Sequence, residues 1–134
     1  MNKISQEVAE KDIVRWLDAR NTSESKRSKM ADQIKELEGY VMEGKLIVKD
    51  DGSLLQKLDC PFGDESIVHE LSFKNRITVG DIQKRMTGNN VKSGDIDGRL
   101  MIYACALTGK AFEQIAKMDS SDYSVTSTVT NFFF

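Results

Sequence analysis

The spacing of hydrophobic residues predicts that the chain begins with a helix. Between Ser5 and Ala19, apolar residues recur at positions i, i+4, i+7 and i+8, a spacing that places them on one face of an α-helix. These residues are Ala9, Ile13, Trp16 and Leu17. We therefore expect one side of this helix to face the protein core.

A second helix with a narrower apolar stripe is predicted up to about Glu43. Asn21, followed three residues later by Glu24, approximates a capping box and indicates where this helix begins. Gly44 is suited to end it in the left-handed conformation. The stripe consists of Met30, Ile34, Leu37 and Val41. Together, residues 1–44 are expected to form a helical hairpin joined by a short polar turn.

The middle of the chain follows the two-residue period of β-strands. Apolar-rich runs at 45–49 and 53–59 flank Asp50-Asp51-Gly52, a turn sequence typical of a β-hairpin. Residues 66–73 then alternate cleanly. One face of that run carries Ile67, His69, Leu71 and Phe73. The pattern predicts a small antiparallel sheet of two or three strands, which needs helices packed on it to be stable.

The helical period returns after Asn75. Thr78 can cap a short helix, and Asp95 can begin a stronger one that Gly109 interrupts. The short helix carries Val79, Ile82 and Met86, and the stronger one carries Ile96, Leu100, Tyr103 and Leu107. A further short helix is expected near 112–116, and Asp119 is another cap candidate. These signals predict a C-terminal cluster of three or four helices.

The last ten residues suit a helix and a strand equally well. Val125, Val129 and Phe132 have helical spacing, whereas Phe133 in place of Phe132 gives a strand. The density of β-branched residues lowers helix propensity here. The elements together predict an α+β protein with a single domain over 1–134. Within it, residues 1–44 form the N-terminal hairpin extension and 45–134 the core.

Composition and charge disfavour several function classes. A chain of 134 residues buries about two-thirds of its surface and needs no metal or disulfide to fold. The net charge of −2 and the lack of aromatics among Lys26, Arg27, Lys29 and Lys35 argue against nucleic-acid binding. No apolar run can span a membrane, and the N-terminus does not resemble a signal peptide. Cys60 and Cys105 are expected to be free thiols in a reducing cytoplasm.

Each apparent reactive motif fails at a named position. Thr108-Gly109-Lys110 resembles the end of a phosphate-binding loop, but Ala104 and Ala111 replace its first glycine and its magnesium-binding hydroxyl residue. Residues 94–98 lack the distal glutamate of a calcium loop. His69 has no nearby cysteine, and the sequence has no serine-centred elbow motif. We therefore expect no enzyme activity, no catalytic residue, no cofactor and no metal.

Two features remain as candidate protein-binding surfaces. The first is the aromatic run Phe132-Phe133-Phe134, which either docks on a partner or closes this protein's own core. The second is the N-terminal hairpin, whose stripes either continue the core or present a groove to a partner helix. The hairpin residues concerned are Trp16, Ile34, Leu37 and Val41.

The order of elements from about Leu54 to Phe133 resembles the Mu-type tail assembly chaperones of contractile-tailed phages. Asp122-Tyr123, after a helix and a polar break, is the most specific similarity. The other similar segments are Leu58–Pro61, Glu70–Thr78, Val79–Ile82, Leu107–Gly109 and Ile115–Asp119.

The resemblance implies a non-enzymatic chaperone in the host cytoplasm that binds the helical tape-measure protein during tail assembly. Tail-tube or baseplate-hub proteins are further expected partners, and self-association into a homo-oligomer is left open. The alternative is a structural virion component, located in the tail or baseplate hub and similar to the small baseplate-hub proteins of T4-like phages.

Overall fold

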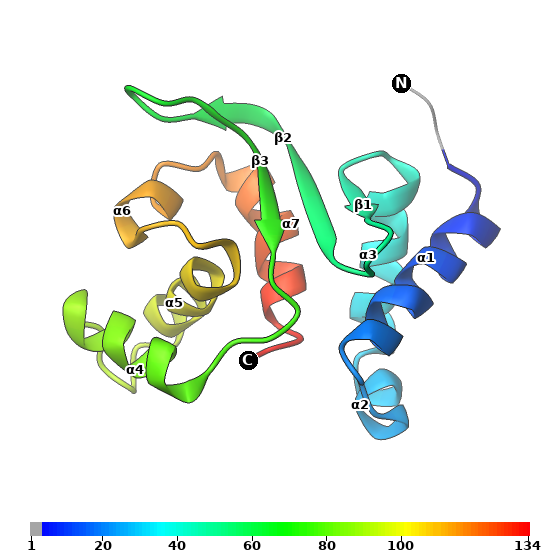
Figure 1. Cartoon of the computed structure of the whole chain (residues 1–134), viewed down its shortest axis with the longest axis horizontal. Coiled ribbons are helices and arrows are strands. Elements are labelled where there is room, and N and C mark those ends of the chain that lie inside the picture. The colour runs from blue at the N-terminus through cyan, green and yellow to red at the C-terminus, as the bar shows by residue number, and fades with distance from the viewer. Residues whose placement is uncertain (1–3) are drawn as a thin grey trace.

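The computed structural model describes residues 4–134 and has the predicted α+β fold. Seven helices and a three-stranded antiparallel sheet make up this described part of the chain (Figure 1). In chain order the elements are α1 (Gln6–Ala19), α2 (Glu24–Lys29), α3 (Ala31–Met42), β1 (Leu46–Val48), β2 (Leu54–Phe62), β3 (Val68–Phe73), α4 (Val79–Gly88), α5 (Ile96–Thr108), α6 (Phe112–Ile115) and α7 (Ser120–Thr130).

Helix α1 buries the predicted face. Ser5 caps its N-terminus by accepting a hydrogen bond from the Val8 N–H. The buried residues are those of the predicted stripe, Ala9, Ile13, Trp16 and Leu17. The helix packs against α3 and β1, so its apolar stripe completes the core beside the first hairpin.

The predicted second helix is interrupted at Met30 and forms α2 and α3. Asn21 is not its cap, because its φ of 56° lies in the left-handed region and an N-cap residue is extended. Ser23 caps α2 instead by accepting from the Lys26 N–H at 3.1 Å. Helix α2 has no buried residue. Of the predicted stripe, Leu37 and Val41 are fully buried in α3, and Met30 and Ile34 are partly buried against the same core.

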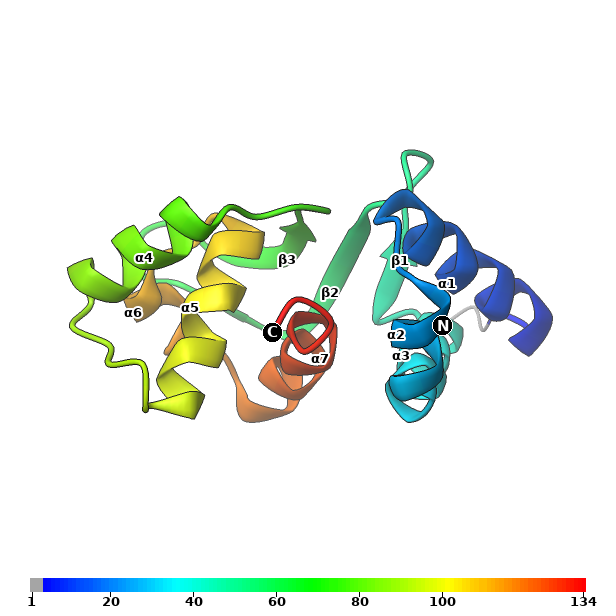
Figure 2. The same ribbon diagram turned by 90° about the horizontal axis from the view of Figure 1, so that it is seen from below.

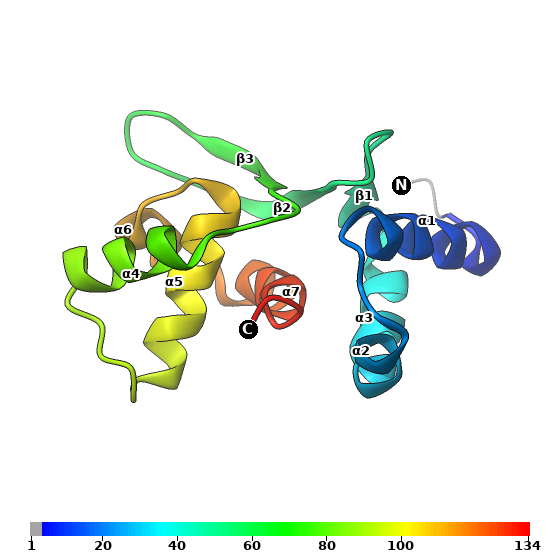
Figure 3. The ribbon, with the colours of Figure 1, turned by 60° about the horizontal axis from the view of Figure 1, so that its bottom comes forward.

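The sheet has the order β1-β2-β3, with helices packed against one face (Figure 3). Gly52, with a φ of 84°, closes the predicted turn between β1 and β2. On the opposite face, the cross-strand neighbours Lys57 and Glu70 form an exposed ion pair at 2.8 Å. This difference between faces fits an antiparallel sheet with one solvated side.

The β2–β3 hairpin departs from the prediction near its tip. Strand β3 begins at Val68, and Ile67 is 52% exposed. His69 is exposed as well, so only Leu71 and Phe73 of the predicted face are buried. The pairing register shifts between Lys57 and Phe62, and this irregularity separates the tip from the regular sheet.

The C-terminal half contains four helices, and the ambiguous last segment is helical. Helix α7 extends to Thr130 and is followed by a turn. In α5 the predicted stripe is wrong in part, because Ile96 is 56% exposed. Helix α5 contacts α4, α6, α7 and β3 and is thus covered on several sides. Its buried residues are Gly98, Ile102, Ala104, Cys105, Ala106 and Leu107.

Helix α7 lies between the N-terminal helices and the α4–α6 group (Figures 1 and 2). It contacts α3, α5 and β2. The main cluster of buried side chains runs from Ala9 to Phe132 and includes Val125 and Val129 of α7. A smaller cluster of Ile82, Ile102 and Ala106 joins α4 to α5. Helix α7 therefore connects the N-terminal helices with the α4–α6 group.

Candidate protein-binding site

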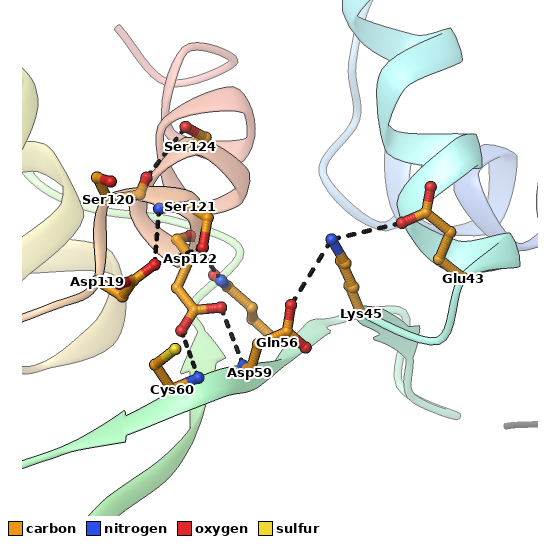
Figure 4. Close-up of polar contacts among 10 residues, drawn as sticks. All are labelled: Glu43, Lys45, Gln56, Asp59, Cys60, Asp119, Ser120, Ser121, Asp122 and Ser124. Atoms are coloured by element: carbon orange, nitrogen blue, oxygen red, sulfur yellow. Dashed lines mark hydrogen bonds and ion pairs between the residues drawn. The ribbon is translucent and has the colours of Figure 1, made fainter.

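A buried polar network fastens α7 to β2 (Figure 4). The Asp122 carboxylate accepts hydrogen bonds from the backbone N–H groups of Asp59 and Cys60, at 3.0 and 2.9 Å. The Gln56 side-chain amide donates to the Asp122 backbone carbonyl at 2.9 Å, and the Thr126 hydroxyl donates to Gln56 Oε1 at 2.6 Å. Since Gln56, Asp122 and Thr126 are buried, these bonds replace the hydration lost on folding.

The two N–H groups that Asp122 binds lie in the irregular stretch of β2. Regular pairing with β3 stops at Lys57 and resumes only at Phe62. The Asp59 and Cys60 N–H groups therefore need partners outside the sheet, and the carboxylate supplies both. Asp122 thus has a different role from Asp119, the predicted cap at the start of the same helix. Only Asp119 caps α7, by accepting from the Ser121 N–H at 3.0 Å.

The segment after α7 carries aromatic side chains into the core. Phe132 has no exposed surface and packs edge-on against Trp16, with ring centroids 5.1 Å apart. The Arg20 guanidinium carbon lies 3.8 Å from the Phe133 ring centroid, and Arg20 also donates to the Phe132 carbonyl at 3.3 Å. Burial and the nearby charge of Arg76 lower the pKa of Arg20 to about 10.

A groove of about 380 Å³ lies between α4, α5 and this terminal segment. Val79, at the start of α4, is 78% exposed beside it. Phe134 lies next to the groove, in edge contact with Tyr103 at 5.1 Å. The apolar and aromatic side chains that line the groove are Ile77, Val79, Ile82, Met86, Tyr103 and Phe133. The remaining lining residues are polar, namely Thr78, Gln83, Ser93 and Arg99, so the groove combines an apolar floor with polar edges.

The residues predicted from the sequence to bind a partner divide into two groups. One group has no exposed surface and belongs to the main core: Trp16, Leu37, Val41 and Phe132. The other group keeps exposed surface: Ile34, Phe133 and Phe134. In this conformation a partner can contact only the second group. Phe133 and Phe134 lie at the groove, whereas Ile34 is on α3 beyond α7.

The groove residues of α4 and α5 were not among the predicted binding residues. Val79, Ile82 and Met86 were expected to form the core face of a helix, yet only Ile82 is buried. The sequence did contain one indication of this exposure. Three apolar residues form too short a stripe to bury the whole length of a ten-residue helix, so apolar side chains near its ends stay exposed. Arg99 and Tyr103 had no local signal, because the terminal segment that completes the groove is about 30 residues away in sequence.

Other chemistry is sparse in residues 4–134. No group of three or more His, Cys, Asp or Glu side chains is arranged to hold a metal ion. Cys60 is exposed and Cys105 is buried, and both are free thiols as predicted. The negative charge of Asp119, followed by partial burial and the charges of Asp122 and Asp59, raises the pKa of Cys60. No helix in this part of the chain is long and apolar enough to cross a membrane.

Comparisons with protein-family models, with curated proteins and with solved structures gave no significant match.

Proposed function

We propose that this protein is a non-enzymatic phage tail assembly chaperone that binds the tape-measure protein in the host cytoplasm. The observation that carries the proposal is the apolar groove between α4, α5 and the Phe133–Phe134 segment. The order of strands and helices, which resembles that of the chaperone family, is a second support.

The walls of the groove favour a helical occupant. The groove is walled by the helices α4 and α5, which offer a partner side-chain contacts and no free strand edge. An extended peptide would leave its own N–H and C=O groups without partners on such a surface. A helix brings its backbone bonds already formed and inserts apolar side chains spaced at i, i+3 or i+4 and i+7. A long helical tape-measure protein offers many such stripes.

Co-expression with the tape-measure protein and affinity capture of the complex test the proposal. Val79→Asp places a charge at the groove, at a first-turn position where aspartate is compatible with the helix. We expect this variant to lose most of the captured tape-measure protein. Ile67→Asp, at an apolar side chain that is 52% exposed on the β2–β3 hairpin away from the groove, is the control and should retain it. If both variants capture the same amount of tape-measure protein, the groove is not its binding site.

Mass spectrometry of purified virions distinguishes the chaperone from a structural component of the tail or baseplate hub. A chaperone leaves before the particle is complete, so it should be absent from virions or far below stoichiometric amounts. Stoichiometric presence would instead establish the virion component.

A further inference from the structure

We propose that the helix bound in the groove carries carboxylates beside its apolar stripe, and that Arg76 and Arg99 pair with them. This inference rests on the proposed function, because it specifies the partner of the same groove. The inference derives from the charged residues around the groove, which are positive although the chain as a whole has a negative net charge.

Two arginines, Arg20 and Arg99, contact the terminal phenylalanines, and a third, Arg76, is the residue before Ile77 of the groove wall. Arg99 lines the groove, and its guanidinium carbon lies 4.9 Å from the Phe134 ring centroid. Arg76 is exposed and directly precedes Ile77 of the groove wall, close enough to Arg20 to lower its pKa after the larger effect of burial. None of the three forms an ion pair with a carboxylate within residues 4–134.

No acidic residue of α4 or α5 lines the groove. Asp81 pairs with Arg85 at 3.1 Å. The Asp95 carboxylate accepts the Gly98 N–H as the cap of α5. Asp97 is exposed on α5 and does not line the groove. Arg99 in the groove lining and Arg76 beside it therefore carry positive charge with no carboxylate in ion-pair distance within residues 4–134, on a chain whose net charge is −2.

An apolar floor with a positive rim matches an amphipathic helix with acidic flanks. The apolar stripe of the helix would cover the floor, while glutamate or aspartate side chains on either side would reach the guanidinium groups. Arginine suits this role because its planar fork can bind a carboxylate through two parallel hydrogen bonds. Charge pairs at an interface rim mainly set specificity and the salt dependence of association. The occupant we propose is thus an acidic amphipathic helix of a partner protein.

Two synthetic helical peptides of about 20 residues test the inference by fluorescence anisotropy. Both carry the same leucine stripe, one with flanking glutamates and the other with glutamines at those positions. We expect the glutamate peptide to bind about tenfold more tightly at low salt and to lose this advantage in about 0.5 M salt. Arg76→Gln combined with Arg99→Gln should remove the preference. Lys11→Gln combined with Lys35→Gln, an equal charge change on exposed residues of α1 and α3, should leave it unchanged.

The Arg99→Lys variant keeps the charge without the fork geometry and should retain most of the salt dependence. Circular dichroism melting curves confirm that each variant is folded. Equal affinity for the two peptides, or a preference unaffected by the double arginine substitution, would overturn the inference.

The tape-measure protein itself separates this result from the proposed function. If wild-type protein binds it, Val79→Asp prevents binding and the double arginine variant binds as well as wild type, the proposed function stands and the acidic-helix inference fails. If wild-type protein does not bind it at all, the proposed function fails, while the peptides still report whether the groove prefers acidic helices.

Discussion

The hydroxyl group of Thr126 donates a hydrogen bond to the side-chain oxygen of Gln56, 2.6 Å away, although neither residue has any exposed surface. Thr126→Val preserves the side-chain shape but leaves that oxygen without its short partner. We expect urea unfolding to show that the free energy of unfolding falls by about 1–3 kcal/mol. Combining it with Gln56→Leu should cost less than the sum of the two single changes by at least about 1 kcal/mol. Strict additivity would mean that the bond contributes nothing.

Asp122→Asn should destabilise the protein by about 2–3 kcal/mol. The amide nitrogen would replace one of the two carboxylate oxygens, so that a donor would face the N–H group of Asp59 or Cys60. Asp119→Asn is the matched control, because asparagine caps a helix about as well as aspartate. It should change the unfolding free energy by less than about 0.5 kcal/mol, and a similar loss in both variants would contradict the special role of Asp122.

The phenylalanines at positions 132 and 134 should respond very differently to truncation. Phe132→Ala removes a fully buried ring from beside Trp16 and should cost about 3–5 kcal/mol. Phe134→Ala removes a ring that is 42% exposed and should cost less than about 1 kcal/mol, while weakening peptide binding at the groove. The fluorescence of Trp16, the single tryptophan, reports unfolding in both variants. A small loss for Phe132→Ala would show that the segment does not close the core in solution.

Alkylation should distinguish the two cysteines. Cys60 is exposed and should react with iodoacetamide in the native protein, whereas buried Cys105 should react only after unfolding. Because Asp119 is the largest cause of the raised pKa of Cys60, Asp119→Asn should lower that pKa and speed the reaction near pH 8. Peptide mapping of the modified sites measures both rates, and an unchanged Cys60 rate would argue against this electrostatic effect.

Stability should fall between pH 9 and 11 through Cys105. Burial raises the pKa of this thiol from 9.0 to about 11, so the unfolded chain ionises first as the pH rises. The stabilisation is fully present below pH 9 and is lost as the pH approaches 11, which amounts to about 1 kcal/mol by pH 10. Cys105→Ala lacks the titrating group and should show a correspondingly flatter pH dependence. Equal pH profiles of the two proteins would contradict the assignment.

Local sequence pattern was sufficient where an element buries a single face. The stripe of α1 predicts all four of its buried residues, and Thr78 and Asp119 cap the helices expected of them. In contrast, α5 packs on several neighbours, so no single stripe describes its burial and the expected position of Ile96 was wrong. Helix existence was thus predictable, but the faces of a surrounded helix were not.

The buried polar contacts could not be predicted because their partners are far apart in sequence. Gln56 lies 66 positions from Asp122, and the Asp59 N–H lies 63 positions from the same carboxylate. The sequence around a single glutamine in an apolar strand contains no repeat or spacing that indicates which residue will bind it. The choice between Asn21 and Ser23 as cap also depended on backbone conformation, which both residue types allow.

The central position of α7 has a consequence for how the chain acquires its structure. Synthesis proceeds from the N-terminus, and α7 follows every element that it contacts. Until residues 120–132 leave the ribosome, Gln56 lacks its buried partner and Trp16 lacks the ring that covers it. Contacts such as that between Arg20 and Phe132 span 112 positions and favour slow, late closure. In a nascent chain, the apolar residues that α7 covers would therefore stay exposed to solvent until α7 has been synthesised.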